Sequence, residues 1–134
     1  MQASYPLWWK DIEVPPPVEW IYTFEELSGD ETAEQWALAS AIFIAQTRRR
    51  TGSGPTFAEL FMHLMPDTNG IPGRLPDDLE FVQRRRIVAA FRGLAAIEWR
   101  RRGMISFDRG VTPSLRVGRE FRAHSRQRQL ARTE

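Results

Sequence analysis

Hydrophobic residues recur every three to four positions over three stretches of the chain, and this period predicts three helices. The first covers residues 28–50, has apolar positions nearly all round its middle, and is stopped by "TGSGP". The second covers residues 56–65 and ends before Pro66. Both open with a hydroxyl residue three positions before a glutamate, the spacing of a capping box: Ser28 with Glu31, and Thr56 with Glu59.

The third predicted helix covers residues 76–102. It opens with Pro76 and with carboxylates at the positive end of its dipole, and Gly103 stops it. Its predicted core face consists of Leu79, Val82, Ile87, Phe91, Leu94 and Ile97. The preceding residues 66–75 are rich in turn formers and predict a loop.

After Gly103 the hydrophobic period shortens to an alternation. Ile105 and Phe107 are expected to point inward from a first strand, and residues 115–117 to return as a second. The segment 104–118 is therefore predicted to be a β-hairpin. The remaining residues 119–134 predict a basic tail, either a short helix or a disordered arm.

The first 27 residues combine many aromatic side chains with three consecutive prolines. Because proline disfavours a helix, we expect an extended arm over residues 1–27. Its tryptophans, Trp8, Trp9 and Trp20, either pack on the body of the same chain or bind a second subunit or another protein.

Together these elements predict one domain that is mainly α with a small β-hairpin, spanning residues 28–118 between the arm and the basic tail. The chain has 134 residues, 42% of them hydrophobic and 27% charged, which is typical of a soluble globular domain. It contains no cysteine, so disulfides, thiol nucleophiles and cysteine-ligated metals are excluded, and a reducing cytoplasm is the expected compartment. The longest uncharged apolar stretch, residues 37–45, is too short to span a bilayer, and no export signal is expected.

Charge is divided unevenly along the chain. Residues 1–83 hold five basic and thirteen acidic residues, a net charge of −8, whereas residues 84–134 hold fourteen arginines and four acidic residues, a net charge of +10. This asymmetry indicates a polyanion as the partner of the basic part, or pairing of the two halves within or between chains. The excess of eighteen arginines over one lysine is typical of high-GC coding, as in an actinobacterium or one of its phages.

Arg84, Arg85 and Arg86 lie early in the third predicted helix, where cations meet the unfavourable end of the helix dipole. Either carboxylates one turn away, such as Glu80, or the phosphates of a nucleic acid compensate for these charges. Helical spacing also places a ridge on the side opposite the core face: Arg85, Ala89, Arg92 and Ala96. A ridge that alternates arginine with alanine is either a solvated helix face or a surface that enters the major groove of DNA.

Three helices followed by a hairpin, with "LAAIEWRRRGMISFDRG" at the junction, resemble the winged helix-turn-helix family over about residues 30–118. The resemblance implies that the helix 76–102 is a recognition helix for double-stranded DNA and that the hairpin 104–118 is the wing. Residues 66–75 make a longer connection than the short turn usual in this family.

The resemblance nominates residues for contact with DNA. Base contacts are assigned to the start of the recognition helix and its ridge: Gln83, Arg84, Arg85, Ala89 and Arg92. Phosphate contacts are assigned to the wing and the tail: Arg109, Arg116, Arg119 and Arg122. The implied function is that of a small transcriptional regulator of bacterial or phage type, with a homodimer expected through the aromatic arm.

The alternative function is that of a protein-interaction module, for example a phage-encoded modulator of a host protein, that binds through the tryptophans of the arm. Catalysis is not expected, because His63 and His124 lie far apart and "RTGSGPT" lacks the lysine of a phosphate-binding loop. His63 is expected to be a partly exposed structural residue, and neither a metal nor a cofactor is expected.

Overall fold

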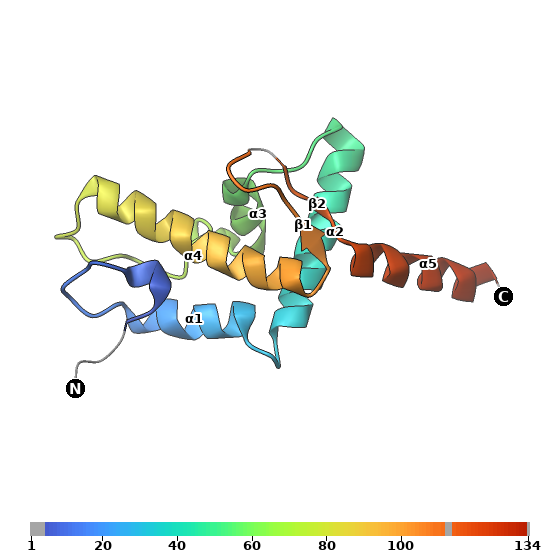
Figure 1. The fold of residues 1–134 in the computed structure, drawn as a ribbon. Helices are drawn as coiled ribbons and strands as arrows, with labels where there is room; N and C mark the ends of the chain where they lie inside the picture. Colours follow the sequence, from blue (N-terminus) through green and yellow to red (C-terminus); the bar gives the residue numbers. More distant parts are fainter. Residues whose placement is uncertain (1–4, 112–113, 134) are drawn as a thin grey trace.

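The computed structural model describes residues 5–111 and 114–133, and it is mainly helical with a small antiparallel hairpin (Figure 1). The elements in chain order are the 3₁₀ helix η1 (Leu7–Trp9), α1 (Val18–Ser28), α2 (Ala33–Thr51), α3 (Phe57–Leu64), the 3₁₀ helix η2 (Pro66–Thr68), α4 (Phe81–Arg101), β1 (Ile105–Ser106), β2 (Arg116–Val117) and α5 (Arg119–Thr133). Among the residues so described, no helix is both long and apolar enough to cross a membrane.

The expectation of an extended arm over residues 1–27 is wrong for its second half, which forms helix α1. Pro17 is the N-cap of this helix, with an extended backbone (φ −62°, ψ 141°) that leads directly into Val18. Proline is well tolerated before and at the start of a helix, so the three prolines precede α1 and do not prevent it. Helix α1 lies alongside α4 in Figure 1 and packs against it.

The capping box predicted at Ser28 is also absent. Ser28 is the last residue of α1, and its hydroxyl donates a hydrogen bond to the carbonyl of Phe24 at 2.6 Å. Helix α2 begins at Ala33, five residues later than predicted, after a turn that contains Gly29. Its predicted end is confirmed, because Gly52 closes it in a left-handed conformation (φ 84°) directly after the arginines of the last turn.

The predicted capping box at the start of α3 is confirmed. The backbone N–H of Glu59 donates to Oγ1 of Thr56 at 3.1 Å, and the Glu59 carboxylate accepts from the backbone N–H of Thr56 at 3.0 Å. The backbone N–H of Thr56, and next its side chain, stabilise the ionised carboxylate by hydrogen bonding and lower the pKa of Glu59. Helix α3 then buries Leu60 and Phe61, two residues of its predicted apolar stripe.

Helix α4 begins at Phe81, later than the predicted start at Pro76. Residues 76–79 form a turn closed by the Leu79 N–H on the Pro76 carbonyl (3.4 Å). Of the three carboxylates expected in the first turn, Asp77 and Asp78 therefore precede the helix, and Glu80 is its N-cap. The buried face of α4 contains Ile87 and Phe91, as predicted. Val82, predicted in the core, is instead 71% exposed, because it lies in the first turn before α4 enters the body.

The core is organised around the ring of Phe91. Three aromatic rings from η1 and α1 surround it, with centroids 5.3 Å (Trp8), 5.0 Å (Trp20) and 5.4 Å (Phe24) away. The Trp20 indole N–H also donates to the Gly73 carbonyl at 3.1 Å, which attaches α1 to the loop before α4. Trp8, Trp20 and Phe24 of the amino-terminal segment therefore pack on their own chain.

The hairpin follows α4 as predicted. Ile105 pairs with Val117 and Ser106 with Arg116 in antiparallel register, and both Ile105 and Phe107 are buried. Residues 112 and 113 of the connecting loop lie outside the described residues. Of the two alternatives predicted for the tail, a short helix or a disordered arm, the structure has the helix, α5, which begins at Arg119.

We expect Phe91→Ala to lower the free energy of unfolding by about 3–5 kcal/mol, because the ring is almost fully buried among three other rings. Urea denaturation measures this loss. The control is Val82→Ala on the same helix, whose exposed side chain should contribute about 0.5 kcal/mol or less. Equal losses for the two variants would contradict the observed rotation of α4.

We expect Glu59→Gln to flatten the acid side of the stability profile. The pKa of Glu59 is lower in the folded chain, so its ionised form stabilises the fold above the unfolded pKa, and this contribution disappears as the pH falls through the folded pKa. The parent should therefore lose more stability than the variant on going from neutral pH to about pH 3. Urea midpoints measured across this range test the difference, and parallel profiles would contradict it.

Candidate nucleic-acid interface

The exposed part of the predicted ridge on α4 lies in the first three turns of the helix. Arg85 and Ala89 of the predicted ridge are exposed there, together with Arg86. The ridge does not continue to Ala96, which is fully buried, because the second half of α4 packs against α2 and β1. The surface available to a partner on α4 is therefore shorter than the predicted ridge.

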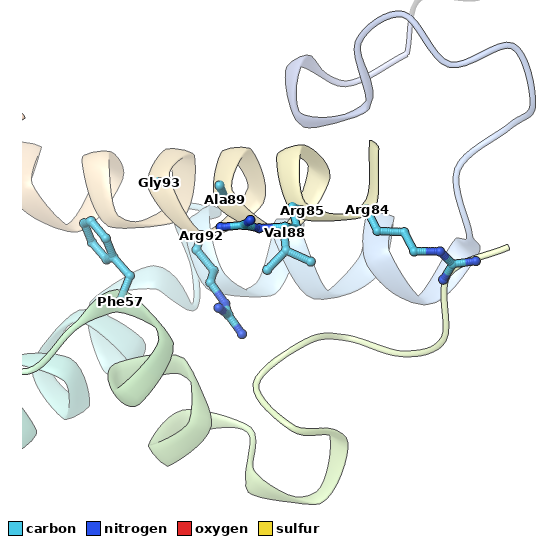
Figure 2. A pocket seen from close by; sticks show the side chains of 7 residues that line it. All are labelled: Phe57, Arg84, Arg85, Val88, Ala89, Arg92 and Gly93. Carbon is cyan, nitrogen blue, oxygen red and sulfur yellow. The ribbon is translucent and has the colours of Figure 1, made fainter. Parts of the chain in front are cut away.

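A pocket of about 600 Å³ lies between this face and the start of α3 (Figure 2). Its lining residues are Phe57, Arg84, Arg85, Val88, Ala89, Arg92 and Gly93. All except Phe57 come from α4, and four of the five nominated α4 residues are among them. The pocket thus combines a hydrophobic wall with guanidinium groups along one side of the helix.

Two nominated residues at the start of α4 are used within the chain. The side chain of Gln83 accepts a hydrogen bond from the Glu80 backbone N–H at 2.9 Å, which caps the helix. Arg84 donates from Nε to the Leu79 carbonyl at 3.0 Å and from Nη2 to the carbonyl of Pro76. These carbonyls, and not the Glu80 carboxylate, therefore compensate for the position of Arg84 in the first turns.

Arg92 is half-buried and fastens the loop before α4. Its Nη2 donates to the Gly70 carbonyl at 3.1 Å, and its guanidinium carbon lies 5.7 Å from the centroid of the Phe61 ring. Burial lowers the pKa of Arg92, but an arginine remains charged in proteins. Arg92 therefore holds the loop before α4 in place, and only part of its side chain faces the pocket.

Arg85 and Arg86 are the exposed cations of this face. The Arg85 guanidinium carbon lies 5.7 Å from the centroid of the exposed Phe81 ring. Within residues 5–111 and 114–133, no salt bridge involves either arginine. The sequence nominated Arg85 for the site but not Arg86 or Phe57. The exposure of Arg86 depends on where α4 begins, and the position of Phe57 depends on how α3 packs beside α4.

The hairpin is attached beside this face by aromatic contacts. The rings of Phe57 and Phe107 meet edge to face with centroids 5.2 Å apart. Arg100 covers the other side of Phe107, with its guanidinium carbon 4.4 Å from the ring centroid, and donates to the Phe107 carbonyl at 3.3 Å. The start of α3, the end of α4 and the base of the hairpin are thereby held together.

The nominated arginines of the hairpin and tail are placed differently from one another. Arg109 is exposed in the hairpin loop. Arg116 makes two contacts with the carboxylate of Asp108, at 3.1 and 3.3 Å, so its charge is partly neutralised. Arg119 and Arg122 are exposed on α5, which projects from the end of the molecule opposite the first turn of α4 (Figure 1).

The nominated tryptophans are inside the molecule. Trp8, Trp9 and Trp20 are 2%, 0% and 0% exposed, so a partner has no access to them in this fold. His63 is exposed and stacks on Phe43, with ring centroids 4.1 Å apart. The part of the chain covered by the structure contains no cluster of three acidic or histidine residues suited to a metal ion, and the His124 side chain lies outside that part.

Comparisons of this chain with protein-family models, with curated proteins and with solved structures found no match. The arrangement of side chains on α4, the hairpin and α5 is therefore the basis for any functional assignment.

Proposed function

We propose that this protein binds double-stranded DNA, with the first three turns of α4 in the major groove and the hairpin as a wing, and that it is a small transcriptional regulator of bacterial or phage type. The observation that carries the proposal is the exposed face formed by Arg85, Arg86 and Ala89. No salt bridge of the described residues neutralises its two arginines.

The chemistry of this face suits a groove. The major groove admits one α-helix, and a guanidinium such as that of Arg85 can donate two hydrogen bonds to a guanine edge. Ala89, one turn further along, is small enough to let the helix approach the bases. Arg86 lies to the side of this pair on the helix and is suited to a phosphate.

Neighbouring elements support the same docking. The contact between Phe57 and Phe107 holds the hairpin next to the open side of α4, with the exposed Arg109 in its loop. Arg84 and Arg92, which bind backbone carbonyls, stabilise the start of α4 and the preceding loop. Their part in this proposal is to hold the reading face in position, since a preordered face loses less entropy on binding.

Other functions have less support from the side chains. A protein-interaction module that uses Trp8, Trp9 and Trp20 would need these side chains at the surface, and all three are buried. The same burial removes the support for a homodimer formed through them. A cytoplasmic location belongs to the proposal, because the DNA of a bacterium or its phage is found there.

We expect Arg85→Ala combined with Arg86→Ala to weaken binding to the preferred duplex by about tenfold or more, since one lost bidentate base contact costs about 1–3 kcal/mol. The duplex would first be obtained by selection from a random library, and affinities would be measured by fluorescence anisotropy. The control, Arg74→Ala with Arg101→Ala, removes the same charge from two other exposed positions and should retain the preference for the selected sequence.

Loss of sequence preference in the Arg85 and Arg86 variant alone would support the reading face. If the parent selects a sequence and this variant retains both the affinity and the preference, α4 is not the reading element.

A further inference from the structure

Helix α5, Arg119–Thr133, is a strongly basic element that projects from the body (Figure 1). Its sequence contains five arginines and a single acidic residue, Glu120. Phe121 in the first turn is partly buried against the core, whereas Arg122, Ser125 and Arg126 are exposed. The start of the helix is therefore anchored to the rest of the protein through Phe121.

Three of its arginines form a ridge. Arg119, Arg122 and Arg126 are separated by three and four residues, so they lie on one side of the helix over about 10 Å of its axis. Together with Arg116 and Ser106 of the hairpin, they border a recess of about 500 Å³. Among the residues that the structure describes, no acidic side chain lines this recess, and four guanidinium groups border one open space.

The nearby carboxylates do not neutralise this ridge. Asp108 binds Arg116, whose side chain remains 40% exposed. Glu120 faces the body, where it borders a different hollow together with Glu34 and Arg102 and lies against Gly103. The three arginines of the ridge, Arg119, Arg122 and Arg126, have no salt bridge within the described part of the chain. Arg122 also donates from Nη2 to the Val117 carbonyl at 3.3 Å.

Such a helix needs a counter-charge. Like charges three and four residues apart repel and weaken a helix, and an isolated helix of about 15 residues is marginal in water. An anion with several negative groups at regular intervals would remove the repulsion and order the helix. Arginine is suited to this role because its planar group donates two parallel hydrogen bonds to a phosphate.

We propose that the α5 ridge, Arg119, Arg122 and Arg126 together with Arg116, binds the phosphate backbone of duplex DNA as a site separate from α4. The inference rests on the proposed function, which supplies the duplex. A row of arginines on one side of a helix is suited to contact successive phosphates along one strand. Contacts of this kind add affinity and salt dependence without reading the base sequence.

The test is the salt dependence of duplex binding by the full chain. We expect Arg119→Gln, Arg122→Gln and Arg126→Gln together to reduce the slope of log affinity against log salt by about 2.7, since each lost phosphate contact contributes about 0.9. Affinity for every duplex, random or selected, should fall by the same factor. Fluorescence anisotropy at about 50 to 200 mM salt measures both quantities.

The matched control is Arg49→Gln, Arg74→Gln and Arg101→Gln, which removes three exposed arginines elsewhere and should leave the slope nearly unchanged. Thermal unfolding checks that each variant is folded. If the triple α5 variant does not fold, Arg126→Gln alone, in the projecting part of the helix, should still reduce the slope by about 0.9.

The outcomes separate the two proposals. If the α5 variant binds with the slope and affinity of the parent, the α5 site is wrong while α4 reading stands. If random duplex binds through α5 but changing Arg85 and Arg86 has no effect on sequence preference, the reading face is wrong and the α5 site stands. A parent that binds no duplex at the lowest salt overturns both.

Discussion

The packing of Phe91 against Trp8, Trp20 and Phe24 is the interaction on which the rest of the structure depends. It turns one side of α4 toward the amino-terminal segment and so fixes which residues of the helix face outward. Arg85, on another side of the same helix, is exposed as a direct result. The surface proposed for DNA is therefore a consequence of how the aromatic residues of the first 27 positions are buried.

Local signals predicted those parts of the fold that depend on neighbouring residues. The capping box at Thr56 and the helix stop in "TGSGP" act within a few residues, and both were correctly predicted. The helix over Val18–Ser28 was missed because the prolines received more weight than the spacing of Trp20, Phe24 and Leu27, which is helical. The capping-box spacing at Ser28 was misleading, because it occurs at the end of one helix and not at the start of the next.

The sequence predicted correctly only those site residues whose position follows from the side of the helix on which they lie. Helical spacing identified Arg85 and Ala89 as outward-facing, and the structure agrees. The partners of Arg84 and Arg92 are backbone carbonyls in the loop before α4, and no pattern of residue types reveals a carbonyl that is brought close by the fold. The same reason explains why the contact between Phe57 and Phe107, which joins α3 to the hairpin, was absent from the sequence prediction.

The burial of the amino-terminal segment has a consequence for synthesis of the chain. The Trp99 indole N–H donates to the Leu27 carbonyl across 72 residues, and Trp20 donates to Gly73 across 53. Because a chain is made from its amino terminus, Trp8 and Trp20 can contact each other early, but they remain without the Phe91 ring until α4 has left the ribosome. The first residues to be made are thus enclosed only after α4 has been made, so this core depends on contacts between residues far apart in the sequence.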